Sequence, residues 1–233
     1  MHKNKKIILV SFATNDLKRS IVRLKAQAEN SNYYNQIKII TPNNLSDANK
    51  DKINFLLKQG KTRGYAYWYW KPLILLDLFK EINEGDIIHY LDVGFHINKT
   101  LSNRFKEYLD LLHEDDRWLL AFQYKNINDR FPNTINLPKR EEYKYTKADL
   151  FHYFDCIDDK KITHTAQFSA GNFLMKKHKN SIFFLTKWIE VFEKNFELID
   201  DTPSNKENFP NFLENRHDQS VFSILCKKNF IGA

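Results

Sequence analysis

The chain has 233 residues, 42% of them hydrophobic and 28% charged, a balance that excludes a disordered protein and favours one folded domain over residues 1–233. The net charge of +7 is spread along the sequence and suits an anionic partner, whether a nucleotide, a nucleic acid or a membrane surface. The two cysteines, Cys156 and Cys226, have no metal-binding or redox spacing, which argues against a disulfide-rich scaffold and favours a reducing compartment.

Apolar periodicity and turn residues predict alternating strands and helices in the first half of the chain. The predicted elements are a strand over 5–14, a helix over 15–30, a strand from Asn35 that Pro42 ends, helices over 46–58 and 71–83, a strand within 85–98 and a strand over 117–125. This order predicts a single α/β domain with a mainly parallel central sheet, flanking helices and a Rossmann-like topology. The apolar segment 65–79 is interrupted by Lys71, Pro72 and Asp77, and it is too short to span a bilayer.

Asp92 ends the buried run of the third strand, in "YLDVG". Ligands of parallel α/β sheets bind beyond the carboxyl ends of the strands, so we expect Asp92 to contact a ligand. A carboxylate at this position could instead cap a helix or hydrogen-bond a loop, and the single residue does not decide between these roles.

The second half begins with an expected insertion over 126–165, which has no clear period and contains a short helix at 146–155. The segment 179–198 predicts an amphipathic helix, for which a core role is favoured over a role at a membrane surface because its polar face is not purely basic.

Two further motifs are candidates for a site. In "QFSAGNFLMKK" (167–177) the small residues Ser169, Ala170 and Gly171 would let a ligand approach the backbone, or would form a tight turn into a strand. In "NRHDQSVFSIL" (215–225) Asp218 and Gln219 open a helix, where Asp218 could also be a simple cap.

The order of these three motifs resembles that in nucleotide-sugar transferases of the GT-A fold. The chain resembles the retaining glycosyltransferases of family eight and related bacterial surface-polysaccharide enzymes over about residues 5–227. The segment "RGYAYWYWKP" (63–72) is similar to that of a bacterial branch that carries "YLDAG" in place of the usual D-x-D motif, and "YTKADLF" (145–151) resembles another element of that branch.

On the donor's nucleotide side, the resemblance implies that Asp92 contacts the ribose or a metal that bridges the diphosphate. It implies that Lys71 faces the donor's phosphates or sugar. Three residues at the end of the first strand are implied to lie near the base: Phe12, Ala13 and Thr14.

On the sugar side, the resemblance implies that Ser169, Ala170 and Gly171 line the donor-sugar pocket. It implies that Asp218 and Gln219 hold the transferring sugar near its anomeric carbon and form the catalytic pair.

Two departures from the family pattern matter. Gly94 stands where D-x-D has its second acid, so the expected divalent metal, Mn²⁺ or Mg²⁺ at Asp92, is left open as a requirement. The chain also ends 14 residues after Gln219, earlier than the family pattern, which leaves open whether the C-terminus is truncated, and His217 is a weak substitute for the family's metal-binding histidine.

The resulting expectation is a hexosyltransferase that uses a UDP-sugar and a bacterial surface glycan or glycolipid acceptor, as in capsule or lipopolysaccharide synthesis. It would act in the cytoplasm or peripherally at the inner membrane. A haloacid-dehalogenase-type phosphatase needs a second aspartate where Gly94 stands. A basic nucleic-acid-binding protein remains the alternative from another class, but no RNP-like, KH or helix-turn-helix signature supports it, so we expect no nucleic-acid partner.

Overall fold

The computed structural model describes residues 5–113, 117–124 and 140–230. The chain divides into two compact units. The first comprises Met1–Leu120 and Gly171–Lys187, and the second comprises Ala121–Ala170 and Trp188–Ala233. The single domain expected from the sequence stays a prediction.

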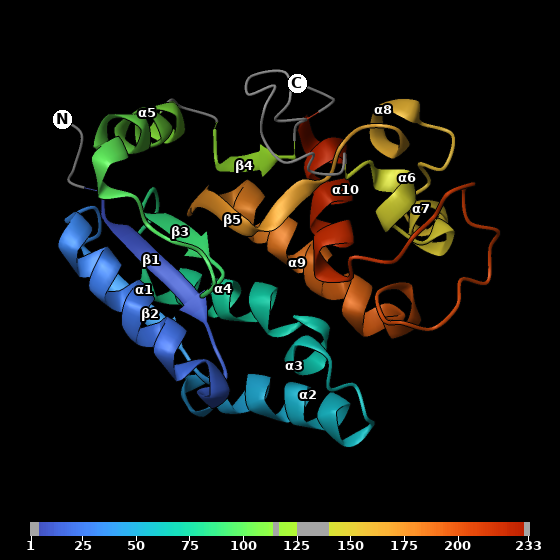
Figure 1. The fold of residues 1–233 in the computed structure, drawn as a ribbon, viewed down its shortest axis with the longest axis horizontal. Helices are drawn as coiled ribbons and strands as arrows, with labels where there is room; N and C mark the ends of the chain where they lie inside the picture. Colours follow the sequence, from blue (N-terminus) through green and yellow to red (C-terminus); the bar gives the residue numbers. More distant parts are fainter. Residues whose placement is uncertain (1–4, 114–116, 125–139, 231–233) are drawn as a thin grey trace. The chain divides into compact units, whose positions relative to one another are not determined.

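The central sheet has five strands in the order β2-β1-β3-β5-β4 (Figure 1). The strands are β1 (Ile7–Phe12), β2 (Gln36–Ile40), β3 (Ile87–Leu91), β4 (Leu119–Gln123) and β5 (Phe168–Lys176). β1 pairs in parallel with β2 and β3, whereas β5 runs antiparallel to β3. Backbone bonds from Lys176 N–H to Trp118 O and from Tyr124 N–H to Gln167 O make β4 antiparallel to β5. β1, β2, β3 and β4 therefore run in one direction and β5 runs against them. The sheet is mixed but mostly parallel, which confirms the predicted α/β class.

A core of the first unit lies between α1 (Lys18–Ser31) and the sheet. Its buried residues are Leu9, Ala13, Leu24, Ala28, Leu91 and Val93. Leu24 and Ala28 are four residues apart and share one helix face, as the predicted periodicity requires. Because Ala13 and Val93 follow β1 and β3, this packing fixes the carboxyl edge of the sheet.

Short and long helices complete the first unit. They are α2 (Asp47–Lys58), α4 (Trp70–Glu81) and α5 (Ser102–His113), with a left-handed turn labelled α3 (Gly64–Tyr67) and 3₁₀ turns at Asn15–Leu17, Pro42–Asn44 and Lys99–Leu101. Pro72 lies in the first turn of α4, where its missing N–H has no intrahelical partner to lose. The predicted helices are thus confirmed, although the first begins as a 3₁₀ turn.

Helices make up most of the regular secondary structure described in the second unit. Its helices are α6 (Glu142–Tyr145), α7 (Ala148–Tyr153), α8 (Lys160–Thr163) and α10 (Asp218–Phe230), with a 3₁₀ turn at Phe196–Leu198. α9 (Lys179–Lys194) runs from the first unit into the second. α7 confirms the short helix predicted at 146–155, and the part of the predicted insertion at 126–139 lies outside the described residues. None of the helices in the described ranges is long and apolar enough to cross a membrane.

Candidate functional site

Asp92 follows directly after β3, the five residues of which are all buried. Its backbone N–H donates to the Gly171 carbonyl at 2.8 Å, one residue beyond the regular pairing of β3 with β5. The side chain is 40% exposed. The carboxylate therefore stands exposed at the carboxyl edge of the parallel strands, the position predicted from the sequence, and its contact with a ligand stays a prediction.

Gly171 makes room for that carboxylate. A Cβ atom at this position would lie 2.6 Å from the Asp92 Oδ2 and 3.0 Å from the ring of Phe95. The sequence suggested that small residues here admit a ligand. In the structure, the missing side chain of Gly171 makes room for the Asp92 carboxylate. Without this glycine, Asp92 could not keep its present side-chain conformation.

Two side chains hold the other oxygen of Asp92. The Tyr90 hydroxyl donates to Oδ1 at 2.6 Å, and the Lys71 Nζ lies 3.5 Å from the same atom. Tyr90 was not predicted as a site residue. It precedes Asp92 by two residues, and in an extended chain this spacing places both side chains on one face, so the spacing could have indicated the contact.

Lys71 is buried, with 2% of its side chain exposed. Its Nζ lies 5.7 Å from the centre of the Trp70 ring and 5.2 Å from that of Tyr90. Burying an ammonium group without a counter-ion is costly, so the Asp92 carboxylate stabilises Lys71 as much as Lys71 stabilises Asp92. The predicted Lys71 and Asp92 are thus brought together as a pair.

The segment before Lys71 forms a left-handed turn. Gly64, Tyr65, Ala66, Tyr67 and Trp68 have φ values of 54°, 55°, 69°, 53° and 60°. A left-handed turn costs roughly 1–2 kcal/mol for each residue that carries a Cβ. The Trp68 ring lies where a Gly64 Cβ would be, at 2.5 Å, and the Trp70 indole N–H donates to the Gly64 carbonyl at 3.0 Å. These contacts explain the glycine and the tryptophans of "GYAYWYW".

Phe12, Ala13 and Thr14 differ in what they offer a ligand. Phe12 is buried and stacks on Trp70 with a centroid distance of 4.0 Å, and Ala13 is buried in the core against α1. Thr14 is partly exposed. Of these three predicted base contacts, Thr14 is therefore the one with an accessible side chain, and Phe12 supports the left-handed turn through Trp70.

The loop after Asp92 is tied to α1. The Arg23 guanidinium donates to the carbonyls of Val93 and Phe95, both at 2.7 Å, and Ile97 N–H donates to the Gln27 side chain at 3.2 Å. A Cβ at Gly94 would meet no heavy atom of the described residues within 4 Å. Arg23 therefore supports the loop without contacting Asp92, and no sequence motif marked it.

A divalent metal does not fit the donor set at Asp92. Mn²⁺ and Mg²⁺ prefer several oxygen ligands, but Gly94 offers no side chain and the Lys71 ammonium lies beside the carboxylate. Within the described part of the chain, no three His, Cys, Asp or Glu side chains gather in a way that could hold a metal ion. The residues of this edge therefore do not form a metal site by themselves.

A buried histidine adjoins the same strand. The His89 Nε2 lies 3.0 Å from the Asn172 side-chain oxygen, which can only accept, so the Nδ1 accepts from the Tyr34 hydroxyl at 2.8 Å. Burial lowers the pKa of His89 to about 4 despite the Asn172 hydrogen bond, and burial also raises the pKa of Tyr34. The ring is therefore neutral near pH 7, and it supports Asn172 next to Gly171.

In the second unit, Asp218 begins α10 and is buried. His217 precedes it with a φ of 53°, and its Nδ1 is 2.6 Å from the Ile199 carbonyl while its Nε2 is 3.6 Å from Asp201. These contacts hold His217 within the second unit. They give it an anchoring role at the start of α10, which the sequence did not indicate.

Gln219 has both ends of its side-chain amide engaged. Its Nε2 donates to the Gln167 Oε1 at 2.9 Å, and its Oε1 accepts from the Tyr124 hydroxyl at 3.3 Å. Gln167 in turn donates to the Glu142 carboxylate at 2.9 Å. Because a carboxylate only accepts, this bond sets the orientation of the Gln167 amide and hence that of Gln219.

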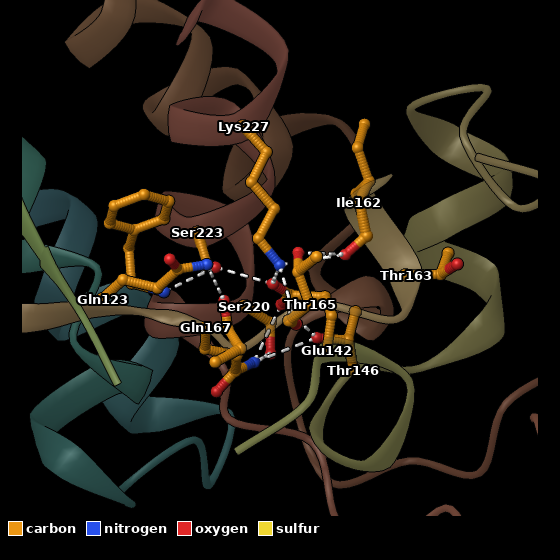
Figure 2. Close-up of polar contacts among 12 residues, drawn as sticks. Gln123, Glu142, Thr146, Ile162, Thr163, Thr165, Gln167, Ser220, Ser223 and Lys227 are labelled. Atoms are coloured by element: carbon orange, nitrogen blue, oxygen red, sulfur yellow. Dashed lines mark hydrogen bonds and ion pairs between the residues drawn. The ribbon is translucent and has the colours of Figure 1, made fainter. Parts of the chain in front are cut away.

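Glu142 is the centre of the buried network in Figure 2. Lys227 and Ser223 donate to its Oε2 at 2.5 and 2.6 Å, and Thr146 donates to its Oε1 at 2.9 Å. Lys227 also donates to the Ile162 carbonyl at 2.9 Å. The ion pair of Glu142 and Lys227 is fully buried and has several further hydrogen bonds, so it stabilises the residues that orient Gln219. No local sequence pattern indicates this network, because its members are far apart along the chain.

Ser169 and Ala170 lie within β5 and are buried. The alternative of a tight turn at Ser169, Ala170 and Gly171 is therefore wrong, because Phe168–Lys176 is one continuous strand. Ser169, Ala170, Asp218 and Gln219 belong to the second unit, whereas Asp92 and the other candidates belong to the first. The donor contacts predicted for each group stay predictions.

No protein-family model matches the chain, and no curated protein matches it. Among solved structures, it is similar to the crystal structure of galactosyltransferase LgtC in complex with donor and acceptor sugar analogues. The identity is 16% and the TM-score 0.43, over 94% of this chain and 70% of that chain.

Proposed function

We propose that the protein is a glycosyltransferase that moves a hexose from a UDP-sugar to a bacterial surface glycan or glycolipid. The observation that carries the proposal is the Asp92 carboxylate. It stands partly exposed at the carboxyl end of β3, with Tyr90 and Lys71 on one oxygen and Gly171 leaving room for the other. α/β sheets bind nucleotides and their derivatives at this edge, and the motif order of the sequence supports the same class.

In the proposed reaction, the bond from the sugar's anomeric carbon to the diphosphate oxygen breaks and its electron pair leaves with UDP. The acceptor oxygen forms the new bond, and its proton passes to the departing phosphate. Asp92 would accept hydrogen bonds from donor hydroxyls, and Thr14 would lie near the base. The anomeric carbon gains oxocarbenium character, which an oxygen of Asp218 or Gln219 on the same face would stabilise. Retention of configuration is part of this proposal.

The test is a panel of nucleotide sugars scored for slow hydrolysis and for thermal stabilisation of the protein. We expect UDP-hexoses to be hydrolysed and to raise the melting temperature. A panel with no hydrolysis and no stabilisation would contradict the proposal. Tight binding of oligonucleotides that weakens steeply with salt would instead favour nucleic-acid binding.

A further inference from the structure

We propose that Lys71 is the resident cation of this site and that the protein binds its donor through Asp92 without a divalent metal. The identity of the ligand, a nucleotide-sugar donor, is taken from the proposed function. The charge arrangement is taken from the structure, in which the Lys71 Nζ lies 3.5 Å from the Asp92 Oδ1. It goes further than the expected loss of one metal ligand at Gly94, because it names the group that takes over the metal's electrostatic role.

The position of Lys71 makes it a fixed part of the site. Its side chain is buried, and its ammonium lies against the faces of Trp70 and Tyr90, which attract a cation. Trp70 is in turn held by Phe12 and by the Gly64 carbonyl. These contacts keep the Lys71 ammonium beside Asp92, in the space that a divalent metal bound to Asp92 would need.

A metal ion bound to Asp92 would have to share the carboxylate with this ammonium. Oδ1 already accepts from Tyr90 and faces Lys71, and two like charges a few ångströms apart repel strongly in a partly desolvated site. The usual remedy is a second carboxylate, but Gly94 supplies none. Asp92 is therefore suited to accept hydrogen bonds from neutral hydroxyl groups, such as those of a ribose or hexose, through its remaining oxygen.

The loop after Asp92 fits the same role. Arg23 donates to the carbonyls of Val93 and Phe95, so the protein itself holds the backbone on both sides of Gly94. Here the protein supplies both the charge and the shape.

The first experiment titrates UDP into the wild-type protein by calorimetry, once in EDTA and once in Mn²⁺. The blank is the titration of UDP into Mn²⁺ without protein. We expect dissociation constants that agree within about threefold. Binding that requires Mn²⁺, or that tightens more than about tenfold with it, would overturn the inference and leave the proposed function intact. Absence of UDP binding under both conditions would remove the proposed function, and the inference with it.

The second experiment compares two buried lysines. Lys71→Met removes the ammonium beside Asp92, and Lys147→Met removes the one that lies 3.5 Å from the buried Asp200 in the second unit. We expect Lys71→Met to weaken UDP binding in EDTA about tenfold or more and to make it respond to Mn²⁺. Lys147→Met is expected to lower the melting temperature and leave UDP binding unchanged.

If Lys71→Met binds UDP in EDTA as tightly as the wild type does, the inference is overturned. An equal loss of UDP affinity in both variants would also overturn it, because it would indicate a general effect of losing a buried charge. If Lys71→Met does not fold, the wild-type titrations with and without Mn²⁺ decide the matter.

Discussion

Gly171 and Asp92 are matched in two ways: the Asp92 N–H donates to the Gly171 carbonyl, and the Asp92 carboxylate fills the space of the missing Gly171 side chain. A strand pairing and a side-chain conformation therefore depend on one glycine. This explains physically why a small residue stands opposite the strand-end acid.

Gly171→Ala is expected to displace Asp92 and to lower the free energy of unfolding by about 1–3 kcal/mol, the usual cost of overpacking. UDP affinity should fall as well. Gly94→Ala is the matched control, because its Cβ would meet no described atom within 4 Å, and it should change stability by less than about 0.5 kcal/mol. Urea denaturation and calorimetry measure both effects. Equal stability of the two variants would contradict the described contact.

Asp92 and Asp218 should have separable roles. Asp92→Asn is expected to weaken UDP binding, because the site loses its charged acceptor and Lys71 its counter-ion. Asp218→Asn is expected to leave UDP affinity nearly unchanged and to lower turnover by about 10²-fold or more, the scale of one lost transition-state contact. If both residues were only helix caps, each variant would lose roughly 1 kcal/mol of stability and keep wild-type turnover at low temperature.

The Glu142–Lys227 pair should dominate the stability of the second unit. Glu142→Gln leaves the Lys227 ammonium buried without its counter-ion and is expected to cost about 3–5 kcal/mol. Adding Lys227→Met should recover a large part of that loss. The exposed pair Arg104–Glu107 is the control, and Glu107→Gln should cost no more than about 0.5 kcal/mol. A small effect of Glu142→Gln alone would contradict the burial of the pair.

His89 should make stability depend on pH. Its folded pKa of about 4 lies below the ordinary value of 6.5, so the unfolded chain binds the proton first as the pH falls. The free energy of unfolding should therefore fall between pH 6.5 and 4, by at most about 1.4 kcal/mol per pH unit from this residue. His89→Gln lacks the titrating ring and should be less sensitive over the same window. Parallel slopes for the two proteins would rule out this role for His89.

The α/β class and the edge position of Asp92 were predictable because apolar runs and turn residues encode them locally. Lys71 was singled out by resemblance, but its burial against Asp92 depends on packing between segments far apart in sequence. Glu142 looks like any surface glutamate in the sequence, since its partner Lys227 is 85 residues away. Such long-range pairs have no local pattern, so only the folded chain reveals them.

The left-handed turn at 64–68 has a consequence for how the protein assembles. Residues with a Cβ avoid this backbone conformation in isolation. The turn is therefore stable only once Trp68 packs on Gly64 and Trp70 contacts Gly64 and Phe12. It should therefore be absent from the folding transition state, and changes such as Trp70→Phe should speed unfolding far more than they slow folding. The segment that leads into Lys71 would then close last, and the charge beside Asp92 would be set only once the surrounding sheet is complete.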